Sequence, residues 1–261
     1  MKKSLITIFC IVLILMQVIA VTALTSIEAK QSWMDAKTVS KEKQTLHQAA
    51  KINFAANKSA ENNQAVVDTG KAVLNAALDE VEAWLNWKKA ETEENTIVSP
   101  DLKNTILTDV QTNLNKVTSL RTDVDSVKTQ LDLGLVFLKM VGKYSELLTN
   151  VARNSGKVFV EVGNSELTKA DGYEAKMRTA AETMPNKDLI ISKLDAAKAE
   201  LAEARTNVSN ANNKYYEVVL PGTPLIKFSE GNNYMRTAKA NLLSAQANLN
   251  AAYLLMLGSG Q

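Results

Sequence analysis

Residues 190–218, IISKLDAAKAELAEARTNVSNANNKYYEV, carry the pattern that decides the fold of this chain. Apolar residues recur there at alternating steps of four and three positions, which is the spacing of a coiled-coil seam. The seam positions are Ile190, Leu194, Ala197, Leu201, Ala204, Val208, Ala211, Tyr215 and Val218. A second seam follows the break at residues 220–224 and consists of Met235, Ala238, Leu242, Ala245, Leu249, Ala252 and Met256. The short connection between the two seams predicts an antiparallel helical hairpin.

Alanine occupies alternate core positions in both seams. Large and small side chains therefore alternate along each helix, and a large side chain of one helix can pack over a small one of the other. We expect the two helix axes to lie close together. The alanines are Ala197, Ala204 and Ala211 in the first seam and Ala238, Ala245 and Ala252 in the second.

Similar seams earlier in the chain predict further long helices. Ser99-Pro100-Asp101 is typical of a helix start, with serine as the cap and proline at the first helical position. The seam that follows has only Asn113 as a polar member, and Gly134 is expected to bend or end its helix. Its apolar members are Ile106, Val110, Val117, Leu120, Val124, Val127 and Leu131, then Leu138, Val141 and Leu148. Two shorter seams are Val67, Gly70, Leu74, Ala77, Val81 and Trp84, and Leu167, Ala170, Tyr173 or Glu174, Met177, Ala181 and Met184.

Two stretches are harder to interpret from their patterns. The β-branched run at residues 158–162 is interpreted as a connection between helices, with a short strand as the alternative. Residues 26–60 are expected to be helical, although their apolar spacing is less regular. Whether one helix continues from Ile27 to Trp87 stays open.

The composition favours helices over a sheet. Only ten glycines and four prolines occur in 261 residues, and aromatic residues make up 5%. We predict an all-α fold, an up-and-down antiparallel bundle of five or six long helices with coiled-coil-like seams, after an N-terminal export segment. The expected divisions are 1–24 for that segment, 25–98 for an N-terminal helical segment and 99–261 for the bundle. The similar motifs LRTDV and ARTNV indicate either two related halves, 99–185 and 186–261, or only the general likeness of helical seams.

The first 24 residues are typical of an export signal. Lys2 and Lys3 precede an apolar run over residues 5–24. Small residues predict cleavage after Ala23, with a site after Ala29 as the weaker choice, whereas the length of the run also suits a retained membrane anchor. In both cases we expect the rest of the chain to be exported across the cytoplasmic membrane, to the cell envelope or the medium. Membrane contact would then come only through residues 5–24, if they are not cleaved.

Several classes of chemistry are excluded or disfavoured by residue usage. Cys10 is the only cysteine, so the rest of the chain has no disulfide, thiolate metal site or cysteine nucleophile. The chain has 30 basic and 28 acidic residues, and the export segment holds Lys2 and Lys3, so the remainder is balanced and does not favour nucleic acid as a partner. His47 is the only histidine and is interpreted as a surface or interhelix residue. We therefore expect no enzymatic activity, no cofactor and no metal site.

Two groups of residues are candidates for an interaction surface. Trp33 and Trp87 are large amphipathic side chains of the kind that anchor interfaces, with core packing as the alternative. Tyr216, Leu225 and Ile226 flank a proline- and glycine-containing loop at a bundle end, where partners often dock, with a loop folded back onto the bundle as the alternative.

Two further positions are candidates for modification. Asn57 and Asn207 each begin an Asn-x-Ser triplet, which is the acceptor pattern for N-glycosylation in hosts that glycosylate exported proteins.

These features predict a non-enzymatic function. The leading hypothesis is an exported helical envelope or cell-surface protein that binds another protein or a second copy of itself. In general style the chain resembles the cysteine-free helical proteins that prokaryotes export to their envelopes. The alternative is an extracytoplasmic bundle that binds a small molecule and resembles a sensor domain.

Overall fold

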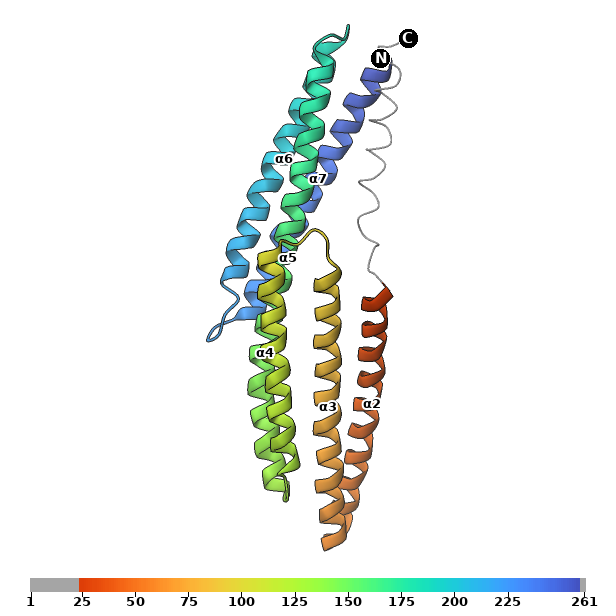
Figure 1. Ribbon diagram of the computed structural model, residues 1–261, viewed down its shortest axis with the longest axis vertical. Coiled ribbons are helices and arrows are strands. Elements are labelled where there is room, and N and C mark those ends of the chain that lie inside the picture. The colour runs from red at the N-terminus through yellow and green to blue at the C-terminus, as the bar shows by residue number, and fades with distance from the viewer. Residues whose placement is uncertain (1–23, 259–261) are drawn as a thin grey trace. The chain divides into compact units, whose positions relative to one another are not determined.

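The computed structural model describes residues 24–258, and within that range the secondary structure is α-helical with no strand (Figure 1). This confirms the predicted all-α class and an up-and-down arrangement of helices, and the six helices match the predicted five or six. The predicted export segment lies almost entirely outside the described residues. No helix over 24–258 is both long and apolar enough to cross a bilayer. The helices are α2 (Leu24–Ala56), α3 (Ala60–Glu94), α4 (Pro100–Asp125), α5 (Gln130–Ala181), α6 (Lys187–Tyr216) and α7 (Pro224–Gly258).

The contacts divide the chain into two compact units. Of the described residues, unit 1 contains 24–96 and 110–137, and unit 2 contains 97–109 and 138–258. Helices α4 and α5 therefore contribute to both units. The predicted boundary after residue 98 and the predicted duplication are not tested by this division and stay predictions.

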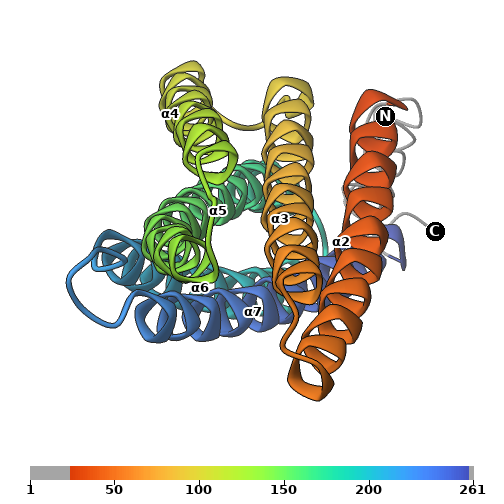
Figure 2. The same ribbon diagram turned by 90° about the horizontal axis from the view of Figure 1, so that it is seen from below.

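In unit 1, α2 and α3 lie side by side and antiparallel (Figures 1 and 2). Residues 57–59 separate them, so residues 27–87 are not one continuous helix. Ser59 caps α3, because its hydroxyl oxygen accepts a hydrogen bond from the Asn62 backbone N–H at 3.2 Å. The predicted α3 seam is right at its start and wrong at its end: Val67 and Leu74 are buried, but burial then shifts to Leu78 and Leu85 instead of Trp84.

In unit 2, α6 and α7 form the predicted antiparallel hairpin (Figure 2). All nine seam positions over residues 190–218 are at most 2% exposed, which confirms that seam. The alanines of α7 pack into the same core, because Ala238, Ala245 and Ala252 are at most 1% exposed. The C-terminal part of α5 completes this core with Val160, Leu167 and other buried residues.

Helix α5 corrects two predictions. The run 158–162 is neither a connection nor a strand, because it lies inside this 52-residue helix. There the Glu161 carboxylate accepts hydrogen bonds from the backbone N–H and the hydroxyl of Ser99, both at 2.6 Å, and so holds the start of α4.

The second correction concerns the end of α4, which stops at Asp125 rather than near Gly134. Thr129 and Asp132 cap α5 reciprocally: the Asp132 N–H donates to the Thr129 hydroxyl, and the Thr129 N–H donates to the Asp132 carboxylate. The pKa of Asp132 is lowered by hydrogen bonds to its carboxylate from the Lys128 N–H, which is the largest cause, and from the side chain and N–H of Thr129. Leu131 consequently belongs to α5 and is 73% exposed, not part of the buried α4 seam.

Candidate functional site

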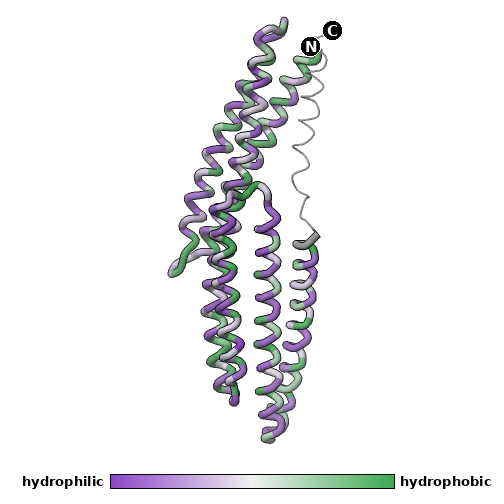
Figure 3. The backbone as a smooth tube through the Cα atoms, in the orientation of Figure 1, coloured by the Kyte–Doolittle hydropathy of each residue, from purple (hydrophilic) through white to green (hydrophobic). Residues whose placement is uncertain are grey.

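The end of the α6–α7 hairpin exposes a group of apolar side chains that we call the apolar tip. It consists of Tyr216, Val219, Leu220, Leu225 and Ile226. Tyr216, Leu225 and Ile226 are 62%, 57% and 58% exposed, and Val219 and Leu220 are exposed as well. The hydropathy colouring shows a hydrophobic stretch where the chain turns between α6 and α7 (Figure 3). The three predicted residues are all exposed at this end of the hairpin, and Val219 and Leu220, which the sequence interpretation missed, are exposed there as well.

The backbone of the tip follows a defined turn. The Val219 N–H donates a hydrogen bond to the Glu217 carbonyl oxygen at 2.9 Å, and the Leu220–Pro221 peptide is cis. Gly222 has φ of 157°, which side-chain-bearing residues rarely adopt, and a Cβ at this position would lie 3.3 Å from the Val219 carbonyl oxygen.

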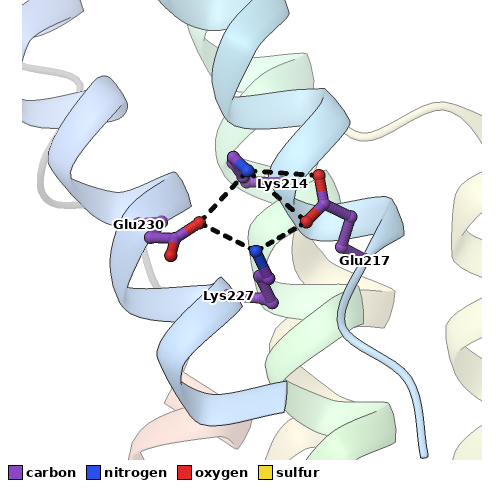
Figure 4. A network of polar contacts seen from close by, with 4 residues as sticks. All are labelled: Lys214, Glu217, Lys227 and Glu230. Atoms are coloured by element: carbon purple, nitrogen blue, oxygen red, sulfur yellow. Dashed lines mark hydrogen bonds and ion pairs between the residues drawn. The ribbon is translucent and has the colours of Figure 1, made fainter. Parts of the chain in front are cut away.

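Four charged residues join the two helices directly behind the tip, and we call them the Lys–Glu quartet (Figure 4). The Lys227 ammonium lies 2.9 Å from a Glu217 carboxylate oxygen and 3.3 Å from a Glu230 oxygen. The Lys214 ammonium lies 3.2 Å from oxygens of the same two carboxylates. Two positive and two negative charges alternate around a ring, so the base of the tip carries no net charge.

The quartet also shifts the titration of its members. Hydrogen bonds from Lys227 first, and from Lys214, lower the pKa of Glu217. The pKa of Glu230 is lowered by the same two lysines, with Lys214 as the larger cause. The pKa of Lys227 is raised, chiefly by its hydrogen bond to Glu217. All three shifts favour the charged forms of Glu217, Glu230 and Lys227.

Tyr215 lies in the core next to the tip. It is the last residue of the α6 seam that is still inside the helix. It is fully buried, and its hydroxyl donates to the Asn232 side-chain oxygen at 2.7 Å. Burial raises the pKa of Tyr215 to about 12. Gly156 of α5 and Gly231 of α7 leave room for the ring, because a Cβ at either position would overlap it. The neighbouring Tyr216 consequently points away from the core.

The two tryptophans predicted as interface residues lie together in unit 1. The rings of Trp33 on α2 and Trp87 on α3 stack with centroids 5.2 Å apart and an angle of 18° between their planes. Lys88 and Lys30 lie over the Trp87 ring, at 3.8 and 5.4 Å from its centroid, and Lys37 lies 5.2 Å from the Trp33 centroid. This arrangement already occupies ring faces on both sides of the stack. It ties the start of α2 to the end of α3, and its use as an interface stays a prediction.

The single histidine lies between helices. The Nδ1 atom of His47 on α2 is 3.0 Å from the Thr69 hydroxyl oxygen on α3, and that hydroxyl donates to the Ala65 carbonyl oxygen at 2.6 Å. Burial, with a smaller contribution from Lys51, lowers the pKa of His47. Across the part of the chain that the structure describes, no group of three or more His, Cys, Asp or Glu residues is arranged to hold a metal ion.

The quartet is a part of the site that the sequence interpretation missed. Lys214 in the last turn of α6 and Glu217, the residue that caps this helix, are three positions apart, and Lys227 and Glu230 are three positions apart on α7. That spacing signals pairing within one helix. The contacts between helices, Lys214 with Glu230 and Lys227 with Glu217, depend on the turn geometry, which the spacing does not give.

Comparison of the chain with protein-family models, curated proteins and solved structures finds no match.

Proposed function

We propose that this chain is a non-enzymatic helical protein of the cell envelope or cell surface that acts by binding another protein through the apolar tip. The observation that carries the proposal is the exposure of five apolar side chains in the α6–α7 loop and on the adjoining ends of the two helices. Contiguous exposed apolar groups are disfavoured in water unless a partner covers them. Export of the chain is part of the proposal and is supported by the sequence pattern of residues 1–24.

The structure of the tip suits a binding surface. Four of its five side chains are aliphatic, the fifth is Tyr216, and the charged quartet adjoins it along both helices, and interfaces commonly combine apolar groups with neighbouring polar ones. The ion pairs of the quartet link the ends of the two helices that carry the tip, so less backbone conformational entropy is lost when a partner docks.

The size of the tip sets a limit on the contact. Five side chains at about half exposure present on the order of 400 Å² of apolar surface, about half of the ~800 Å² that each partner buries in an interface of standard size. A stable complex therefore needs neighbouring helix surface as well. With the tip alone, the contact is of the weak, transient class.

The test for self-association compares two variants of the full chain. Leu225→Ser with Ile226→Ser removes the aliphatic centre of the tip, and Leu243→Ser is the matched control, because Leu243 is an exposed leucine on α7 outside the tip. Light scattering coupled to size-exclusion chromatography over a concentration series gives the mass. Association of the wild type and the control, but not of the tip variant, would identify the partner as a second copy. Equal association of all three proteins would overturn the role of the tip.

If the wild type is monomeric at all concentrations, a photo-reactive amino acid at position 225 tests a different protein partner. We expect a discrete crosslinked product in intact cells of the source organism, and no such product from the same group at position 243. Absence of a product at 225, or identical products at both positions, would overturn the proposal. The small-molecule alternative stays a prediction, which a ligand-dependent rise in Tm in a thermal-shift screen would favour.

A further inference from the structure

The two Asn-x-Ser triplets of this chain occupy different environments. An N-glycosylation enzyme must reach the side-chain nitrogen of the asparagine and the hydroxyl two residues later, which requires an exposed, non-helical acceptor segment. Both triplets satisfy the sequence pattern equally, so the structure has to discriminate between them.

Asn57 lies in the three-residue break between α2 and α3. Asn57 and Lys58 are exposed, and Ser59 has extended backbone angles, φ −76° and ψ 159°. The Asn62 side chain donates to the Asn57 carbonyl oxygen at 2.8 Å, and the Ser59 hydroxyl oxygen accepts from the Asn62 N–H. These bonds hold the backbone of the triplet open at the surface and leave the Asn57 side chain outside the helices.

Asn207 lies in the middle of α6 and faces α7. Its side-chain nitrogen, the atom that would be glycosylated, donates to the Glu203 carbonyl oxygen at 3.0 Å and to the Asn241 side-chain oxygen at 3.2 Å. Asn241 in turn donates to Glu200 at 2.8 Å. Val208, the central residue of the triplet, is buried in the seam. A sugar on Asn207 would break the link to α7, and the helical backbone withholds the triplet from an enzyme that needs it extended.

We propose that Asn57 is an acceptor for an N-linked oligosaccharide in the folded protein and that Asn207 is not. The reaction joins the Asn57 Nδ2 to the anomeric carbon of the sugar, breaks the bond from that carbon to the phosphate of a lipid-linked oligosaccharide donor, and transfers the amide proton to a base of the enzyme. In the cell this modification rests on the proposed export, because the transferase and its donor act on exported segments.

The experiment uses the purified, folded full chain, incubated with membranes that supply an oligosaccharyltransferase and its lipid-linked donor. Mass spectrometry of the glycopeptides gives the modified position. We expect modification at Asn57 and none at Asn207, loss of all modification in Asn57→Gln, and unchanged modification in Asn207→Gln. Ser59→Thr keeps both the acceptor pattern and the helix cap, so it should be modified like the wild type.

The chain unfolded in urea and diluted into the same reaction is the positive control, and it should be modified at both positions. Modification of the folded chain at Asn207 to the same extent as at Asn57 would overturn the proposal. So would an unmodified Asn57 in the folded chain when the unfolded chain is modified there. Because no export occurs in this assay, protease accessibility of the chain in whole cells tests the proposed location separately.

Discussion

The two hairpins α2–α3 and α6–α7 are held together in different ways. The α6–α7 pair has a continuous apolar seam in which every predicted α6 position is buried. Among the α2 residues whose side chains the structure describes, 26–56, only Ser26, Ser40 and Ala50 are buried, and apolar residues such as Leu46 and Ile52 are exposed. The α2–α3 pair relies instead on local contacts, among them the Trp33–Trp87 stack and the hydrogen bond from the Ser26 N–H to Glu94 at 3.0 Å. Similar helices can thus be paired by a repeating apolar core or by a few separate side-chain contacts.

This difference predicts unequal costs for the same substitution in the two hairpins. Leu201→Ala on α6 removes a side chain that is 1% exposed in the core of unit 2, and should lower the free energy of unfolding by about 3 kcal/mol. Leu46→Ala on α2 removes a side chain that is 56% exposed, and should change it by less than about 0.5 kcal/mol. Urea unfolding followed by circular dichroism measures both. Equal losses would show that α2 buries its apolar residues in solution.

The glycines around Tyr215 test how tightly the α6–α7 core is packed. Gly156→Ala places a Cβ into the Tyr215 ring, and should lower the free energy of unfolding by about 2–3 kcal/mol. Gly172→Ala is the matched control, because the site is helical and has open space around the new Cβ, and it should gain about 0.5–1 kcal/mol. If Gly156→Ala is as stable as its control, the Tyr215 ring can shift without a loss in the free energy of unfolding.

Of the contacts that pair α2 with α3, we expect the tryptophan stack to contribute most to stability. Trp33→Ala loses the stacking with Trp87 and the contact with Lys37, and we expect a loss of about 1–2 kcal/mol in the free energy of unfolding. Trp33→Phe keeps an aromatic face and should lose less. The near-ultraviolet circular dichroism of the folded protein should change in both variants, because it reports the paired indoles. An alanine variant with wild-type stability would show that the Trp33–Trp87 stack does not stabilise the α2–α3 pair.

The smallest expected effect concerns the Lys–Glu quartet at the α6–α7 end. The lowered pKa of Glu217 and Glu230 means that their pairing stabilises the folded state above their ordinary pKa of 4.5 and is lost as the pH falls through the lower folded values. The raised pKa of Lys227 gives a contribution that is present below its ordinary pKa of 10.5 and is lost as the pH rises through the folded value. Lys227→Met should move the pKa of Glu217 back toward 4.5 in an NMR titration of the carboxyl carbons. No change in that variant would show that the pair does not form in solution.

The α6–α7 hairpin could be predicted from the sequence more fully than the α2–α3 hairpin. The α6 seam was predicted residue by residue, because the spacing of apolar residues directly indicates a repeating pattern of burial. The Thr129–Asp132 cap is also a local signal, and with it the end of α4 could have been placed correctly. The Trp33–Trp87 stack joins two helices through residues far apart in the sequence, and no local pattern specifies such a pair. The apolar tip was predicted in part, since Val219 and Leu220 looked like ordinary loop residues until the turn showed them exposed.

The shared helices α4 and α5 also have a consequence for the order in which the chain can fold. Ser99 at the start of α4 donates hydrogen bonds from its backbone N–H and its hydroxyl to the carboxylate of Glu161, 62 residues later in the chain. During synthesis from the N-terminus, residues up to 137 complete unit 1 while residues 97–109 still lack their partners. The first turns of α4 must therefore wait for the second half of α5. A chain whose synthesis stops after residue 137 but before the second half of α5 would have a complete unit 1 and an incomplete unit 2.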